Sequence, residues 1–195
     1  MKKRIAALAI LVLALFTLMM TGCGSKDGES NGETASQGGS TESAYRDDVA
    51  LTDIRDAVAQ AYGANYLPSM TLDAEALANM YGVTEDMYEE ALGEVPMISV
   101  QVDTLILVKA KSDRVEDVKA AFENYRTYQL EEGMNYPMNV PKIEASEVAV
   151  YGDYVCYIML GVIEDDLKDD EAAMLTAFQE QNQIAKTAIE TALTR

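Results

Sequence analysis

The spacing of apolar residues predicts three short helices at the start of the folded region. Apolar side chains recur every three or four residues over 51–62, and Gly63 follows as a stop signal. The same spacing predicts a second helix over 73–81, which Gly82 ends. A third helix is predicted over 84–92, where the apolar residues also share one helical face.

A long strand is predicted next, because the period of the apolar residues changes to two. Apolar and polar residues alternate from Ile98 to Asp103, and the run then becomes apolar on both faces as far as Val108. This pattern is typical of a strand that is half exposed at its start and more buried later. The following helix is predicted to begin at Ser112 and to close at Gly133.

A hairpin and a final helix complete the predicted fold. Residues 135–142 should form a loop stiffened by two prolines, and Gly152-Asp153 is a two-residue turn signal between two β-rich runs. An acidic loop over 164–171 leads into a helix over about 169–193. The order ααα-β-α-β-β-α predicts an α+β fold, in which helices pack on one face of a small, mainly antiparallel three-stranded sheet.

The first 22 residues have the pattern of a secretory signal. Three basic residues precede a 16-residue apolar run, which is shorter than the roughly 20 residues of a transmembrane helix. The run ends in Met20-Thr21-Gly22-Cys23, which resembles the lipobox of bacterial lipoproteins. The resemblance implies that residues 1–22 are a lipoprotein signal peptide and that Cys23 is lipidated, which would hold the protein on the extracytoplasmic face of the cell membrane. The alternative is an ordinary cleaved signal followed by an incidental cysteine.

Composition separates a linker from a single domain. Residues 23–44 comprise Cys23 and a Gly/Ser-rich stretch without large apolar side chains, which predicts a flexible linker. Residues 45–195 are enough chain for one α+β domain with a proper core. The net charge of −18 becomes −21 when the three basic signal residues are removed. Such acidity argues against nucleic acid as a partner and against direct electrostatic docking on anionic lipid.

Several blocks of the domain resemble a known family. They are "AYGANYLPSM", "PMISVQVDTLILVKAK", "AFENYRTYQ", "NYPMN" and "GDYVCYIMLG", and they lie behind a lipobox. Together they are similar to an uncharacterised family of clostridial, low-GC Gram-positive lipoproteins, the domain of unknown function 4358. The resemblance implies a Gram-positive cell surface and one α+β domain, and it supplies no catalytic residues.

The absence of histidine restricts the chemistry open to the chain. It removes Ser-His and Cys-His pairs and almost every catalytic zinc arrangement, so no catalytic residue, cofactor or metal is predicted. Asp103 is a mild candidate for a carboxylate-dependent hydrolase, although an outward-facing place on a half-exposed strand explains it more simply. The acidic loop over 164–171 could hold Ca²⁺, but it lacks the spacing and the glycine of a preorganised site. Cys156 is expected to be a small buried hydrophobe.

Tyrosine supplies the candidate binding surface. Tyr125, Arg126, Tyr136 and Asn139 should cluster around a helix end and the loop over 135–142, where two prolines would limit the ordering cost of recognition. The alternative is that these side chains pack at the edge of the core. Five methionines are expected to fill the core, namely Met80, Met87, Met138, Met159 and Met174.

These observations favour a noncatalytic binding or accessory module at a bacterial cell surface. It would reach the membrane through its lipid anchor and contact an unknown small ligand or a protein partner. One alternative is a structural or assembly factor that contacts a membrane or wall protein. The other is a carboxylate-dependent hydrolase of the cell wall or of carbohydrate.

Overall fold

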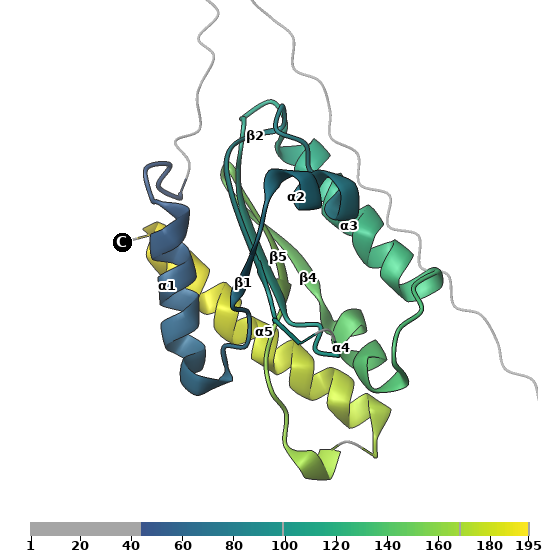
Figure 1. Ribbon diagram of the computed structural model, residues 1–195. Coiled ribbons are helices and arrows are strands. Elements are labelled where there is room, and N and C mark those ends of the chain that lie inside the picture. Colours follow the sequence, from purple (N-terminus) through teal and green to yellow (C-terminus); the bar gives the residue numbers. More distant parts are fainter. Residues whose placement is uncertain (1–43, 99, 168, 195) are drawn as a thin grey trace, which may run out of the picture. The chain divides into compact units, whose positions relative to one another are not determined.

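The computed structural model describes residues 44–98, 100–167 and 169–194 (Figure 1). The expected signal peptide and lipidation site at Cys23 lie outside the described residues, as does nearly all of the expected linker. The helices are α1 (Leu51–Tyr62), α2 (Ala74–Tyr81), α3 (Val115–Glu131), α4 (Val140–Ala145) and α5 (Glu171–Thr194). The strands are β1 (Met70–Leu72), β2 (Tyr88–Val95), β3 (Thr104–Ala110), β4 (Glu147–Tyr151) and β5 (Tyr154–Met159).

The fold is α+β, and its antiparallel sheet has five strands in the order β1-β2-β3-β5-β4. The predicted number of three strands is therefore wrong. The helix predicted over 84–92 is largely strand β2, which pairs with β3 along most of its length. A register shift between Tyr88 and Glu90 breaks the period of two in β2, so its apolar residues imitate a helical face. Strand β1 is three residues long and leaves no pattern to detect.

Helices cover both faces of the sheet, whereas the sequence predicted one covered face (Figure 1). Helices α1 and α5 pack on the face that carries Leu105 and Leu107 of β3. Helices α2 and α3 pack on the opposite face, which carries Ile106 and Val108. Successive side chains of a strand point to opposite faces, so the continuous apolar run in β3 reflects burial on both sides.

Local signals correctly predicted several boundaries. The Asp73 carboxylate accepts a hydrogen bond from the backbone N–H of Ala76 at 2.8 Å and caps α2, and Gly82 ends that helix in the left-handed conformation with φ 73°. The hairpin turn lies at Gly152-Asp153 between β4 and β5, as predicted. The loop predicted over 135–142 instead contains α4, because Pro141 occupies the first turn of a helix, where its missing N–H costs nothing.

The strand predicted from Ile98 begins only at Thr104. The preceding segment is a connection between β2 and β3 in which Met97, Ile98 and Val100 are exposed. Its alternating pattern therefore does not reflect pairing in the sheet. This connection passes over the end of the sheet at which the candidate site lies.

Candidate functional site

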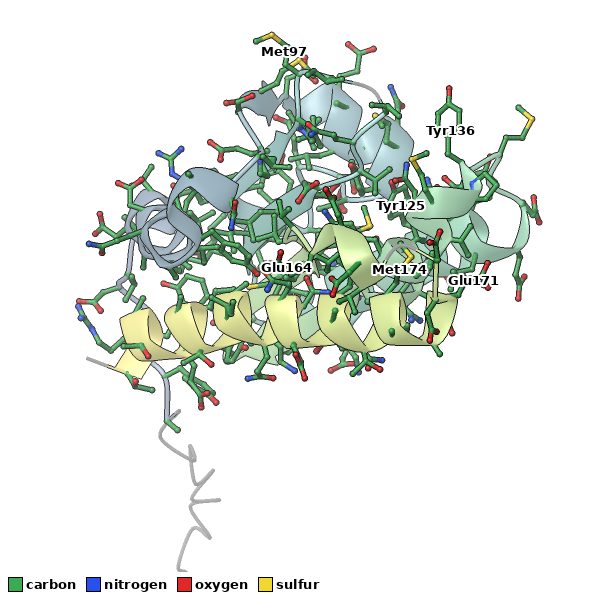
Figure 2. All side chains as sticks on the ribbon, turned by 90° about the horizontal axis from the view of Figure 1, so that it is seen from below. Met97, Tyr125, Tyr136, Glu164, Glu171 and Met174 are labelled. Carbon is green, nitrogen blue, oxygen red and sulfur yellow. The ribbon has the colours of Figure 1, made fainter. Side chains whose placement is uncertain are left out.

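A cluster of exposed apolar side chains surrounds one end of the sheet. It draws on β1, the end of α2, the connection between β2 and β3, and the segment that follows α3. We call it the methionine surface, and it comprises Met70, Met80, Met97, Ile98, Val100, Met134, Tyr136 and Met138. Figure 2 shows Met97 and Tyr136 projecting outward while Tyr125 lies farther inside. Surfaces of this kind on soluble domains mark sites of interaction.

A pocket of about 300 Å³ opens within the methionine surface. Its apolar walls come from Met70, Met80, Val95, Pro96, Met97, Val102, Ile143 and Met159, and its polar groups from Gln101, Asp103, Thr104, Tyr125 and Gln129. The pocket forms because the short β1 and the connection after β2 stop beside the C-terminal half of α3. It is apolar with a few polar groups, which is the usual character of a binding site.

Tyr125, which lines the pocket, packs against two further tyrosines. The ring centroids of Tyr81 and Tyr125 lie 4.4 Å apart, and Tyr157 contacts Tyr125 edge-on with centroids at 5.5 Å. Burial raises the pKa of all three hydroxyls, so each stays neutral near pH 7. This tyrosine cluster therefore carries no charge near pH 7.

Asparagine side chains fix the two segments that border the pocket. The Asn139 side-chain amide donates to the carbonyl oxygen of Val100 at 3.0 Å and joins the segment after α3 to the connection before β3. The Asn135 amide donates to the carbonyl oxygen of Gln129 at 2.6 Å and holds the first of these segments against α3. These bonds fix the backbone of both segments. The side chains of Met97 and Tyr136, which the segments carry, are exposed.

The pocket continues as an open groove along α3. A second depression of about 590 Å³ shares Met80 and Tyr125 with the pocket and extends past Gly82 to Arg114. From Arg114 to Tyr128 the helix rises about 21 Å. The combined surface is therefore long enough for a segment of polypeptide.

Three of the four predicted surface residues belong to this site. Tyr125 lines the pocket, Tyr136 is exposed at its border and Asn139 positions the border. Arg126 does not join them, because its guanidinium donates to the carbonyl oxygens of Ser146 at 3.0 Å and Glu144 at 2.6 Å. Arg126 therefore links α3 to the end of α4.

Most of the exposed methionines at the site were not predicted from the sequence as surface residues. Met159 and Met174 are buried as predicted, but Met80 and Met138 are exposed. Exposure depends on where the sheet ends, which helical spacing alone does not reveal. The sequence offered one weak signal, the apolar run Pro96-Met97-Ile98, which was instead predicted to be the start of a strand.

Asp103 is buried rather than outward-facing, so that expectation is wrong. Its Oδ2 atom lies 2.6 Å from the ammonium of Lys142, and Oδ1 accepts the backbone N–H of Gly161 at 3.1 Å. The residue precedes β3 at the point where α4 and the end of β5 meet. Burial lowers the pKa of Lys142, and the neighbouring carboxylate opposes that shift.

The acidic loop and the cysteine have structural roles. Asp170 accepts the backbone N–H groups of Ala172 and Ala173 at 3.1 Å and so caps α5. Over the described ranges, no group of three or more acidic or cysteine side chains is placed to hold a metal ion. Cys156 lies buried in β5 as predicted, and burial raises the pKa of its thiol to about 12.

Comparison with known proteins places the pocket within a described family. No helix in the described part of the chain has the length and apolar character needed to cross a membrane. No curated protein and no solved structure matches the chain. One family model matches residues 61–160, a range that contains every residue lining the pocket. The chain belongs to this family, which is described as Domain of unknown function (DUF4358).

Proposed function

We propose that this protein is a noncatalytic docking module, which holds a partner protein by an apolar anchor placed in the methionine surface. The observation that carries the proposal is the pocket of about 300 Å³, which the exposed methionines Met70, Met80 and Met97 line. A lipid on Cys23 would keep the module at the extracytoplasmic face of a bacterial membrane.

The extent of the exposed surface favours a protein partner over a small ligand. The pocket is at the small end of the range for ligand sites, roughly 300–1,000 Å³. Met134, Tyr136 and Met138 do not line it, although they are exposed beside it. A small molecule in the pocket would leave these side chains in water, whereas a protein surface would cover them. Flexible methionines adapt to a partner, and tyrosines are common at the energetic centres of interfaces.

The excess of acidic side chains in the domain indicates which residues should flank the apolar anchor of the partner. Residues 44–195 contain 29 acidic and 11 basic side chains. Cations beside the pocket and the groove are already engaged: Lys142 pairs with Asp103 at 2.6 Å, and Arg114 pairs with Asp117 at 2.9 Å. We therefore expect a partner segment in which basic residues flank the apolar anchor, because complementary charge accelerates encounter and selects partners.

The burial of Asp103 favours binding over catalysis. Its carboxylate is paired with Lys142 and accepts a backbone N–H, so it is not free to serve as an acid or a base in hydrolysis. Among the described residues, none of the other side chains that line the pocket is a carboxylate. The carboxylate-dependent hydrolase therefore gains no support from this site.

Peptide binding tests the proposal. The compact unit Thr41–Arg195, which contains every described helix and strand and all three hydrophobic clusters, would be titrated with a labelled 14-residue amphipathic peptide of leucine and lysine. We expect saturable binding, and much weaker binding of the same peptide with glutamate in place of lysine. The double variant Met97→Ser/Tyr136→Ser should weaken binding by at least about tenfold, or 1.4 kcal/mol.

A matched control locates the binding. Val150 and Ile184 are also exposed apolar residues, but they lie outside the methionine surface. The variant Val150→Ser/Ile184→Ser should bind the leucine-lysine peptide as tightly as the unsubstituted protein. Equal losses in both double variants would contradict the proposal. Thermal stabilisation by a sugar or a wall fragment, without any peptide binding, would favour a small-ligand module instead.

The anchor is tested separately in the full-length protein. Expressed in a Gram-positive host, the unsubstituted chain should fractionate with the membrane and carry the mass of a diacylglyceryl group on Cys23. The variant Cys23→Ser should lose both properties. Membrane association that survives this change would contradict lipid anchoring.

A further inference from the structure

Among the described residues, the most exposed methionines lie on the segments that form and border the pocket. Residues 44–195 contain eight methionines, and five of them are exposed in the structure: Met70, Met80, Met97, Met134 and Met138. All five belong to the methionine surface. Met159 and Met174 are 3% and 5% exposed and lie within the cores. The thioethers that solvent reaches most easily are therefore those of the docking site.

The two remaining sulfur-containing side chains of the described residues are less accessible to oxidants. Met87 is half-buried and packs against the core that contains Ile106 and Val108. Cys156 belongs to β5, is 1% exposed and packs against the helices α1 and α5. Reaction with an oxidant requires a thiolate that solvent can reach, and this thiol meets neither condition. Oxidation of the folded protein should therefore begin at the five exposed methionines.

We propose that these methionines form an oxidation-sensitive switch, which releases the docked partner when a hydroperoxide or hypohalous acid reaches the protein. The inference rests on the proposed docking function. With hydrogen peroxide, a lone pair of the thioether sulfur attacks one oxygen and the O–O bond breaks. The sulfur gains an S–O bond and is oxidised by two electrons to the sulfoxide. The other oxygen leaves with the hydrogens as water, so the peroxide is reduced.

The sulfoxide opposes docking by its polarity. It replaces a flexible apolar group with a strongly polar one, which keeps its hydration only while the surface stays open to water. Burying several sulfoxides beneath a partner's apolar anchor would remove that hydration without supplying hydrogen bonds. Because the five side chains lie outside the cores, the fold itself should survive their oxidation. The change is reversible, since methionine sulfoxide reductases restore the thioether.

Peroxide treatment of the Thr41–Arg195 unit tests the switch. The protein would be exposed to graded hydrogen peroxide, mapped by peptide mass spectrometry and titrated with the leucine-lysine peptide. We expect oxygen to be added to the five exposed methionines before Met159 and Met174. We also expect peptide affinity to fall by at least tenfold while the circular dichroism spectrum is retained. Reductases of both sulfoxide epimers should restore the affinity.

Leucine variants separate oxidation from other damage. Replacing all five exposed methionines by leucine keeps the surface apolar but removes the reactive sulfur. The affinity of this variant for the peptide, whatever its starting value, should be the same before and after peroxide treatment. If it folds poorly, the double variant Met97→Leu/Met138→Leu should still lose less affinity on oxidation than the unsubstituted protein.

The possible results distinguish the switch from the docking function. Unchanged affinity after complete oxidation of the five methionines would overturn the switch while leaving docking intact. Oxidation of Met174, which lies away from the pocket, as early as the surface residues would also overturn it, because unfolding would then explain any loss. If the untreated protein fails to bind the peptide, the docking function fails and the release step fails with it.

Discussion

The ammonium of Lys142 lies 2.6 Å from the carboxylate of Asp103, and both side chains are almost fully buried. Lys142 also donates to the carbonyl oxygen of Gly161 at 2.8 Å, while Asp103 accepts the N–H of the same residue. The aromatic ring of Phe178 lies 5.3 Å from the ammonium. These two charges and the backbone of Gly161 thus connect α4 to the start of β3, to the segment after β5 and to α5.

Removing one member of this pair should be more damaging than removing both charges. The variant Lys142→Met leaves the Asp103 carboxylate buried without its cation, and we expect it to lower the free energy of unfolding by about 3–5 kcal/mol. The double variant Lys142→Met/Asp103→Asn keeps an acceptor for the Gly161 N–H and should recover more than half of that loss. Urea unfolding of the two single variants and the double variant measures this coupling. Strictly additive effects would contradict an energetically coupled pair.

Alkaline pH should destabilise the folded protein, because buried tyrosine hydroxyls ionise more easily in the unfolded chain. Burial, together with the hydrogen bond donated to Glu94, raises the pKa of Tyr66, and burial also raises the pKa of Tyr62. A pKa raised on folding contributes stability that is fully present below the unfolded value of about 10 and is lost as pH rises toward the folded value. The free energy of unfolding should therefore fall with increasing pH above about 10.

The variant Tyr66→Phe provides the check. Arg55 still pairs with Glu94 at 2.6 Å in this variant, so the carboxylate keeps a partner. The slope of stability against pH above about 10 should become shallower by one bound proton, or about 1.4 kcal/mol per pH unit. Chemical unfolding at several pH values measures that slope. An unchanged slope would show that Tyr66 ionises as easily in the folded protein as in the unfolded chain.

Local chemistry predicted the elements whose boundaries depend on neighbouring residues. Helix α2 begins at the Asp73 cap and ends at Gly82, and the hairpin turns at Gly152, because capping and turn preferences act within a few residues. Strand β2 escaped prediction because its bulge hides the alternation and its identity comes from pairing with β3. Burial of the sheet on both faces is likewise a property of packing.

Some residues of the site were likewise predicted from local sequence patterns, whereas the positions of others depend on tertiary contacts. Composition alone pointed to Tyr136 and Asn139, because tyrosine and a proline-stiffened segment occurred together. The exposure of Met70 and Met97 depends on the short β1 and on the point at which β2 stops, both of which are set by contacts distant in sequence. Asp103 was misplaced for a related reason. Its partner Lys142 is 39 positions away, and no local pattern connects them.

Asn182 should prove essential to the junction of α5 with the sheet. It is fully buried, accepts the N–H of Leu160 at 2.9 Å and donates to the carbonyl oxygen of Ala145 at 2.8 Å. The variant Asn182→Leu would leave two buried backbone groups without partners, and each costs about 1–3 kcal/mol. We expect a loss of several kcal/mol in thermal or urea unfolding. The exposed neighbour Gln183 offers the matched control, and Gln183→Leu should change stability by less than about 0.5 kcal/mol.

Two glycines with positive φ should tolerate alanine very differently. At Gly82, with φ 73°, an added Cβ would meet the Cβ of Ala121 at an ordinary 3.7 Å. Gly82→Ala should therefore cost only the left-handed backbone penalty of about 1–2 kcal/mol. At Gly161, with φ 112°, an added Cβ would lie 2.4 Å from the Cβ of Gln181 on α5. That atom cannot move unless the helix moves.

Gly161→Ala should therefore combine backbone strain of about 1–3 kcal/mol with an overpacking cost of about 1–3 kcal/mol. Lys142 donates to the C=O of Gly161, and Asp103 accepts its N–H. Displacing Gly161 should therefore also weaken the buried pair. The variant Gly161→Ala should consequently lose part of the coupling between Lys142 and Asp103, whereas Gly82→Ala should retain all of it. Double-mutant cycles in each background measure this difference. Equal coupling in both would show that the pair holds its geometry without the Gly161 segment.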